Sequence, residues 1–288
     1  MKKIIKKKTA AKKIVAKKSS SIKTASKSKK SWWIWLLSIG NIIAFMAVLI
    51  VNYLAVTLPL GGMTTGALSD LYPNLFTPAA LTFSIWGVIY LLLFAFVIWQ
   101  IVDFYKKQST GITKKIWIWF LLSCAANIGW MFARQYQYVL LSIVIMLAFL
   151  VILIVIANKV QLGKKLWSLW DKYLVQVPFS LYLWWISVAT IANASAVLVH
   201  YGRNMFGLSD IFRTIIVILV ATLLALLQLY KKYNVIFALV VIRAFMWIII
   251  KRVAVDPVYA SSIIWTLGVC IAVITTTIGR RFEQWKNN

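Results

Sequence analysis

The sequence predicts an all-α polytopic transmembrane bundle of about eight spans, and three observations support this fold class. Of the 288 residues, 62% are apolar. Apolar runs of about 20 residues recur along the chain, which is the length that a helix needs to cross a hydrocarbon core about 30 Å thick. The formal charge is nonetheless +26, because basic residues gather before the first run and at the ends of the others. This segregation excludes an ordinary soluble domain.

The N-terminal segment, residues 1–30, carries 13 lysines and no acidic residue. A low-complexity tract of Lys, Ala and Ser cannot bury enough apolar surface to fold alone, so we expect a disordered cytoplasmic tail. Its charge predicts binding to anionic lipid at the membrane surface. Contact with nucleic-acid phosphates, independent of base sequence, is the alternative.

Eight apolar runs follow the tail, each bounded by charged or turn-forming residues. They cover about residues 32–58, 79–102, 116–133, 138–157, 174–199, 211–230, 233–250 and 258–278. The first five make up the segment 31–200. The last three, with a short basic C-tail, make up the segment 201–288.

Prolines and basic residues limit the first four runs. The first run ends at Pro59, and Pro78 precedes the second. The third lies between Lys115 and Arg134, and the fourth ends at Lys159. Proline suits the start of a helix rather than its interior, and Lys and Arg mark the points where a span leaves the hydrocarbon.

The remaining runs are limited by basic residues. The fifth starts after Lys172, and the eighth ends at Arg280. The sixth and seventh are separated by Lys231 and Lys232, which predicts a tight helical hairpin.

The charges of alternate connections predict the orientation. The N-tail, the C-tail and the connections on the same side hold 26 of the 32 Lys and Arg residues, and the other side holds 5. Cytoplasmic loops retain positive charge. We therefore expect a protein integral to the cell membrane, with the bilayer as its surroundings and both termini in the cytoplasm.

The acidic residues and the cysteines exclude several functional classes. All six acids fall in loops or tails, which argues against pumps that carry protons on an intramembrane carboxylate and leaves a channel or passive carrier open. The sequence contains no glycine-rich phosphate loop, paired carboxylates, nucleophile motif or His/Cys cluster. We expect no catalytic residue, no metal and no required cofactor, and we expect Cys124 and Cys270 to be packing residues.

Arg243 lies near the middle of the seventh run. A charge at that depth is costly and usually faces a partner, a cavity or the bundle interior. Because no intramembrane acid is available, its partners would be carbonyls, water or an anionic ligand. Arg243 is therefore a candidate anion contact, with a structural role as the alternative.

Three spans carry aromatic, amide and small residues at helical spacing. They are Trp86 and Tyr90 in the second span, Asn127 and Trp130 in the third, and Trp185, Ala189 and Asn193 in the fifth. Residues three, four or eight apart share one helix face. The alternating directions of the spans bring Trp86, Asn127, Trp130 and Asn193 to one depth, in the half of the membrane nearest the loop 59–77. This convergence predicts a ligand pocket with aromatic walls and a few amide groups; helix packing through the same residues is the alternative.

These motifs resemble those of the tryptophan-rich sensory protein family, the TspO/MBR group that includes the mitochondrial translocator protein, also called the peripheral benzodiazepine receptor. The resemblance rests on the stretch from Pro78 through Trp86-Gly87-Val88-Ile89-Tyr90, on Asn127-x2-Trp130, and on Trp185-x3-Ala189-Thr190-x2-Asn193. It covers about residues 32–200, in the family's order.

The resemblance implies a five-helix core, often homodimeric, that binds porphyrins or other flat apolar molecules in a pocket covered by the first loop. Carried over to this sequence, the pocket residues are Trp86, Asn127, Trp130, Ala189 and Asn193. Ala194 stands where the family's sterol signature has a tyrosine, which argues against sterol recognition. The three C-terminal spans lie beyond this core.

The resulting functional prediction is binding of a small, flat hydrophobic ligand, a porphyrin or another tetrapyrrole, for sensing or transport. One alternative is a permease-like transport component in which Arg243 contacts an anion. A second alternative is an enzyme that degrades porphyrin in light.

Overall fold

The computed structural model describes residues 36–58, 60–71, 75–76, 80–105, 112–160, 162, 169–201, 209–232 and 235–286. The lysine-rich tail, residues 1–30, lies outside the described residues, as does Pro78. The disorder and lipid binding of the tail therefore stay predictions.

All regular structure in the described parts of the chain is helical, which confirms the predicted fold class. The elements are the N-terminal helix Leu36–Thr57, α2 (Thr65–Asp70), the 3-10 helix η1 (Ala80–Ser84), α3 (Ile85–Tyr105), α4 (Ile112–Gln135), α5 (Val139–Lys159), α6 (Leu169–Asp171), the π-helical turn η2 (Lys172–Gln176), α7 (Val177–His200), α8 (Asp210–Lys232), α9 (Val235–Val255) and α10 (Ser261–Lys286).

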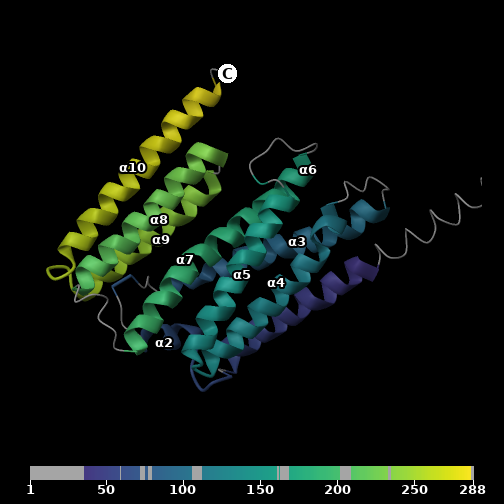
Figure 1. The fold of residues 1–288 in the computed structure, drawn as a ribbon, viewed down its shortest axis with the longest axis horizontal. Coiled ribbons are helices and arrows are strands. Elements are labelled where there is room, and N and C mark those ends of the chain that lie inside the picture. Colours follow the sequence, from purple (N-terminus) through teal and green to yellow (C-terminus); the bar gives the residue numbers. More distant parts are fainter. Residues whose placement is uncertain are drawn as a thin grey trace, which may run out of the picture.

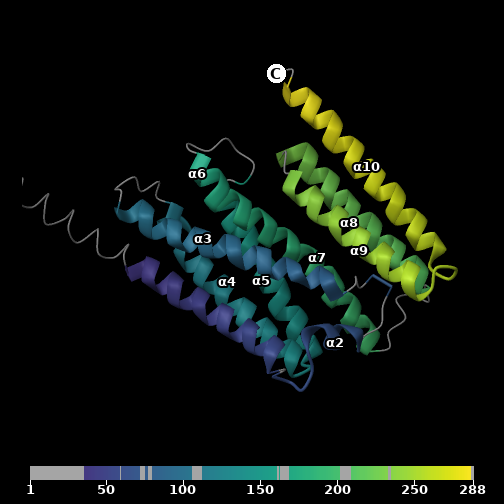
Figure 2. The same cartoon turned by 180° about the vertical axis from the view of Figure 1, so that it is seen from behind.

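The long helices form two groups that lie side by side (Figure 1). The N-terminal helix, α3, α4, α5 and α7 form one bundle, in which α5 packs against both α4 and α7. The second group consists of α8, α9 and α10, which pack against one another. The view from behind shows the same two groups (Figure 2), and α9 joins them by packing against α7.

Seven of the long described helices are long and apolar enough to cross a membrane, whereas the sequence predicts eight spans. The exception is α9, the helix of the predicted span 233–250. It continues beyond Ile250 to Val255 and so includes Lys251 and Arg252 in addition to Arg243. Arg243 lies in the middle of α9 and two more cations lie near its end, whereas the charged residues of the other long helices lie near their ends.

The fifth span is longer than predicted. The segment Lys172–His200 is continuously helical over 29 residues, and a π-helical turn precedes α7. Pro178 lies in the first turn of α7. Because proline has no N–H to donate and its ring crowds the preceding turn, a widened turn just before it accommodates the ring.

Phenylalanine side chains fill the half of the first bundle that lies away from α2. Phe45, Phe96, Phe120 and Phe179 are each at most 1% exposed. The ring of Phe96 contacts Phe179 and Phe120 edge to face, with centroids 4.8 Å and 5.4 Å apart. Such edge-to-face pairs are favourable beyond the burial of their area, so this half of the bundle is a packed core.

Apolar side chains also cover the outer surface. Leu91 is 69% exposed on α3, Leu223 is 56% exposed on α8 and Trp265 is 76% exposed on α10. Such surfaces are stable against hydrocarbon and costly against water. The exposed apolar surface and the seven span-length helices are typical of a membrane protein. Cys124 and Cys270 are buried, as expected for packing residues.

Candidate functional site

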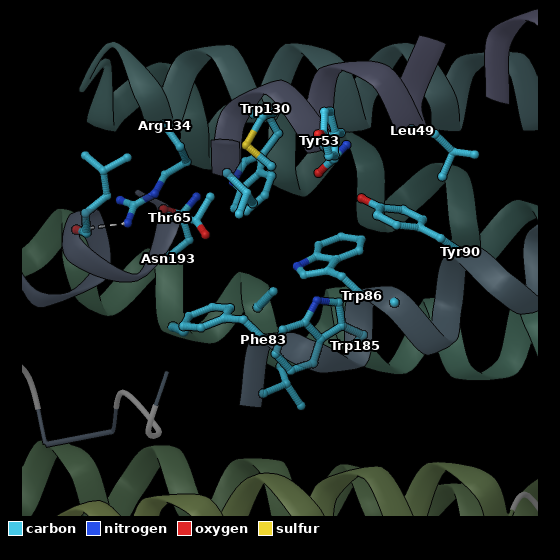
Figure 3. A pocket seen from close by; sticks show the side chains of 18 of the residues that line it. Leu49, Tyr53, Thr65, Phe83, Trp86, Tyr90, Trp130, Arg134, Trp185 and Asn193 are labelled. Carbon is cyan, nitrogen blue, oxygen red and sulfur yellow. Dashed lines mark hydrogen bonds between the residues drawn. The ribbon is translucent and has the colours of Figure 1, made fainter. Parts of the chain in front are cut away.

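A cavity of about 560 Å³ lies in the half of the first bundle nearest α2 (Figure 3). The N-terminal helix, α2, η1, α3, α4 and α7 all contribute side chains to its lining. The lining is mainly aromatic and aliphatic, with a few polar groups from the N-terminal helix, α2, α4 and α7. This combination of a concave apolar surface and sparse polar groups is typical of small-molecule sites.

Most of the predicted site residues meet at this cavity. Those that line it are Trp86, Tyr90, Trp130, Trp185, Ala189 and Asn193. Asn127 is fully buried and lies behind the lining, and Arg243 is outside the lining. The structure therefore brings three predicted helix faces to one depth, as their spacing implies, while ligand binding by these residues stays a prediction.

Trp86 lies at the centre of the aromatic part of the lining. Its ring stacks on Tyr90 with centroids 5.3 Å apart, and it contacts Trp185 edge to face at 6.0 Å. Trp130 lies 6.2 Å away in a tilted arrangement, and Tyr182 contacts Trp86 edge to face at 6.1 Å. Each distance is within the range at which aromatic rings attract one another. Trp86 is thereby held in place by four neighbouring rings and presents a flat aromatic surface.

Asn127 supports the cavity through hydrogen bonds to three other helices. Its Oδ1 accepts a bond from Asn52 Nδ2 at 2.8 Å, and its Nδ2 donates to the hydroxyls of Tyr182 at 3.2 Å and Tyr90 at 3.4 Å. Asn52 Nδ2 also donates to the backbone oxygen of Val48. A buried amide is stable only when its polar atoms are paired, so this network fixes the position of Tyr90, which does line the cavity.

Three N–H donors of the lining residues have no hydrogen-bond partner among the described residues. They are Nε1 of Trp130, Nε1 of Trp185 and Nδ2 of Asn193, and all three atoms are buried. The other amide atom of Asn193, Oδ1, accepts a bond from Ser142 Oγ at 3.2 Å, which sets the orientation of the amide. A buried donor without an acceptor costs about 1–3 kcal/mol. Acceptor atoms on a bound molecule would remove that cost once these side chains turn their N–H groups toward the cavity.

The short helix α2 covers the outer end of the cavity. Thr65 and Leu68 of α2 line it, and Leu68 is only 2% exposed. Arg134, at the end of α4, also lines the cavity, and its Nη2 donates to the backbone oxygen of Leu68 at 3.5 Å. The guanidinium therefore connects α4 to the cover and places a positive charge at this end.

Gln135 fixes the loop that leads to α2. Its Oε1 accepts a bond from the backbone N–H of Gly61 at 3.2 Å, and its Nε2 donates to the backbone oxygen of Ala55 at 3.2 Å. The chain at Gly61 runs so close to α4 that a Cβ atom there would overlap the backbone oxygen of Gln135. Only glycine allows this approach.

A model of the family described as TSPO-like protein matches residues 34–280. The chain belongs to this family. The match confirms the resemblance read from the sequence and extends it, because it continues through α10 rather than stopping near residue 200. No curated protein and no solved structure gives a significant match to this TSPO-like protein.

Arg243 of the TSPO-like protein contacts η1. Its Nη2 donates to Ser84 Oγ at 3.2 Å, and it is partly buried. Within the described chain the one ion pair joins Arg213 to Asp210 on α8, so Arg243 has no carboxylate partner there. The contact with Ser84 links the two groups of helices, and an anion contact at Arg243 stays a prediction.

Sequence reasoning missed three polar residues that shape the cavity of this TSPO-like protein: Asn52, Arg134 and Gln135. Asn52 and Gln135 have partners 74 to 80 residues away in the sequence. No local spacing marks such pairs. Arg134 could have been found from the sequence. It ends the span that carries Asn127 and Trp130, and it lies one helical turn after Trp130 on the predicted pocket face.

Proposed function

We propose that this TSPO-like membrane protein binds a porphyrin or another flat tetrapyrrole in the cavity beneath α2, for sensing or transport. One observation carries the proposal. The rings around Trp86 and the unpartnered N–H donors of Trp130, Trp185 and Asn193 belong to residues that line the same cavity. The volume of about 560 Å³ is within the usual range for small-molecule sites, about 300–1,000 Å³.

The electrostatic character of the lining favours an anionic ligand. Among the described residues, the lining includes Arg134 and no Asp or Glu. Natural porphyrins combine a flat apolar ring with carboxylate side chains. The ring would stack on the indoles, and the carboxylates would accept hydrogen bonds from the N–H donors and from Arg134, since hydrogen bonds to ionised groups are the stronger ones.

Quenching of tryptophan emission by protoporphyrin IX tests this proposal. Purified protein in detergent is titrated, and the wild type is compared with the double variant Trp86→Phe/Trp130→Phe. We expect saturable quenching that weakens in the double variant. The matched control is Trp265→Phe, because Trp265 is 76% exposed on α10 and does not line the cavity. Quenching that is not saturable, or that weakens equally in the control, would contradict the proposal.

Light-dependent breakdown of the bound porphyrin is a second candidate, favoured by the stacked pair of Trp86 and Tyr90 with centroids 5.3 Å apart. Both rings can donate an electron to an excited porphyrin. Under light and in air, porphyrin absorbance would then decay faster with the protein than with an equal concentration of free tryptophan. Equal decay rates would exclude this candidate.

A further inference from the structure

The helix α9 packs along α7, and two of its contacts with the first bundle lie close to the cavity. Phe237 lies against Trp184 of α7, and Arg243 Nη2 donates to Ser84 Oγ of η1 at 3.2 Å. Phe237 and Trp184 are 2% and 3% exposed, so their contact is fully buried. One apolar and one polar side chain of the same helix thus both contact the first bundle.

Both contacts lie next to the lining of the cavity. Ser84 follows Phe83 in the chain, and Trp184 precedes Trp185. Phe83 and Trp185 line the cavity and contact each other edge to face, with centroids 6.1 Å apart and planes at 89°. In Figure 3 this pair lies on the side of the cavity that faces the helices of the second group. Each contact of α9 is therefore one residue away from a side chain that shapes the cavity.

Two side chains that are adjacent in one helix can face different partners and still move together. Successive residues of a helix point about 100° apart, so Trp184 can face α9 while Trp185 faces the cavity. Packed interiors transmit small displacements because they contain few voids. A shift of Trp184 or of Ser84 would therefore move the Phe83–Trp185 pair.

We propose that Arg243 and Phe237 are positioning residues, through which the three C-terminal helices hold the Phe83–Trp185 pair in the geometry that the ligand needs. This assigns a role to α8–α10, which lie within the family match. A test of this inference by porphyrin binding rests on the proposed function, whereas a test by hydrogen–deuterium exchange does not.

Full-length variants test the polar contact. Arg243→Ala removes the donor, Ser84→Ala removes the acceptor, and Arg243→Lys keeps a cation that can donate to Ser84. We expect each alanine variant to weaken protoporphyrin IX binding about three- to tenfold, and the double variant to be no weaker than either, because the two changes remove one interaction. Arg243→Lys should restore most of the affinity. The control is Met246→Ala, a change on the exposed face of α9.

Hydrogen–deuterium exchange of the peptides covering residues 80–90 and 183–190 supplies the second readout. Exchange should be faster in Arg243→Ala and in Phe237→Leu than in the wild type, and unchanged in Met246→Ala. Faster exchange in both peptides supports the positioning role even if the wild type does not bind porphyrin, in which case only the proposed function fails. Unchanged exchange, or equal effects in the Met246 control, would overturn the inference.

Discussion

Asn52 and Asn127 form a buried hydrogen bond of 2.8 Å between the N-terminal helix and α4. Asn127 also bonds the hydroxyls of Tyr90 and Tyr182, on α3 and α7. One amide therefore connects four helices around the cavity, and its loss would leave several polar groups unpaired in a medium without water.

Asn127→Ala should destabilise the protein strongly. It leaves Asn52 Nδ2 without its side-chain acceptor and the two tyrosine hydroxyls without a donor, and each unpaired buried group costs about 1–3 kcal/mol. The midpoint of unfolding by SDS should therefore fall clearly. Asn158→Ala is the control, because Asn158 is exposed on α5. An equal midpoint in Asn127→Ala and the control would show that the network contributes nothing.

The unpartnered donors should make the cavity selective for ligands with acceptors. We expect protoporphyrin IX, which carries two carboxylates, to bind more tightly than etioporphyrin, whose substituents are all alkyl groups. Asn193→Ala and Trp130→Phe should each reduce this preference about three- to tenfold, the effect of losing one hydrogen bond. Both ligands are titrated by fluorescence quenching under the same conditions. Equal affinities for the two porphyrins in the wild type would contradict this assignment.

Gly61→Ala should speed release of the ligand. The added Cβ would overlap the backbone oxygen of Gln135, so the loop before α2 must move away from α4 and α2 would cover the cavity less well. Stopped-flow displacement of bound porphyrin measures the dissociation rate. Gly40→Ala is the matched control, since a Cβ at Gly40 meets nothing within 4 Å. A dissociation rate in Gly61→Ala no faster than in the control would show that the cover does not limit release.

The lysine-rich tail should bind anionic membranes. A peptide of residues 1–30, with its 13 lysines, should bind vesicles containing phosphatidylserine much better than neutral vesicles, since each basic residue near the surface contributes about 1 kcal/mol. Binding should weaken as the salt concentration rises. Co-sedimentation measures both effects, and equal binding to the two kinds of vesicle would refute the prediction.

The helices and the depth of the cavity could be predicted because they follow from local patterns. The spacing of Trp86 and Tyr90, or of Trp185 and Asn193, determines which side chains share a helix face. The alternation of charged connections then determines which faces meet. The family match over residues 34–280 agrees with this prediction.

The remaining features depend on contacts between distant segments. The approach of Gly61 to Gln135 and the packing of Phe237 on Trp184 join residues that no spacing relates. The cations of α9 were visible in the sequence, but its extension past Ile250 was not. The homodimer and the cytoplasmic termini stay predictions.

The phenylalanine core has a consequence for the route of the ligand. The ring of Phe45 contacts Tyr90, a residue of the cavity lining, with centroids 6.4 Å apart, and Phe96, Phe120 and Phe179 continue the packed core beyond it. The cavity therefore does not continue into this core. Passage along the bundle axis would require several interlocked rings to separate, whereas Tyr53 and Val56 of the lining are 67% and 57% exposed on the N-terminal helix. A ligand that exchanges at the α2 end, or at this exposed side of the lining, does not have to disturb the phenylalanine core.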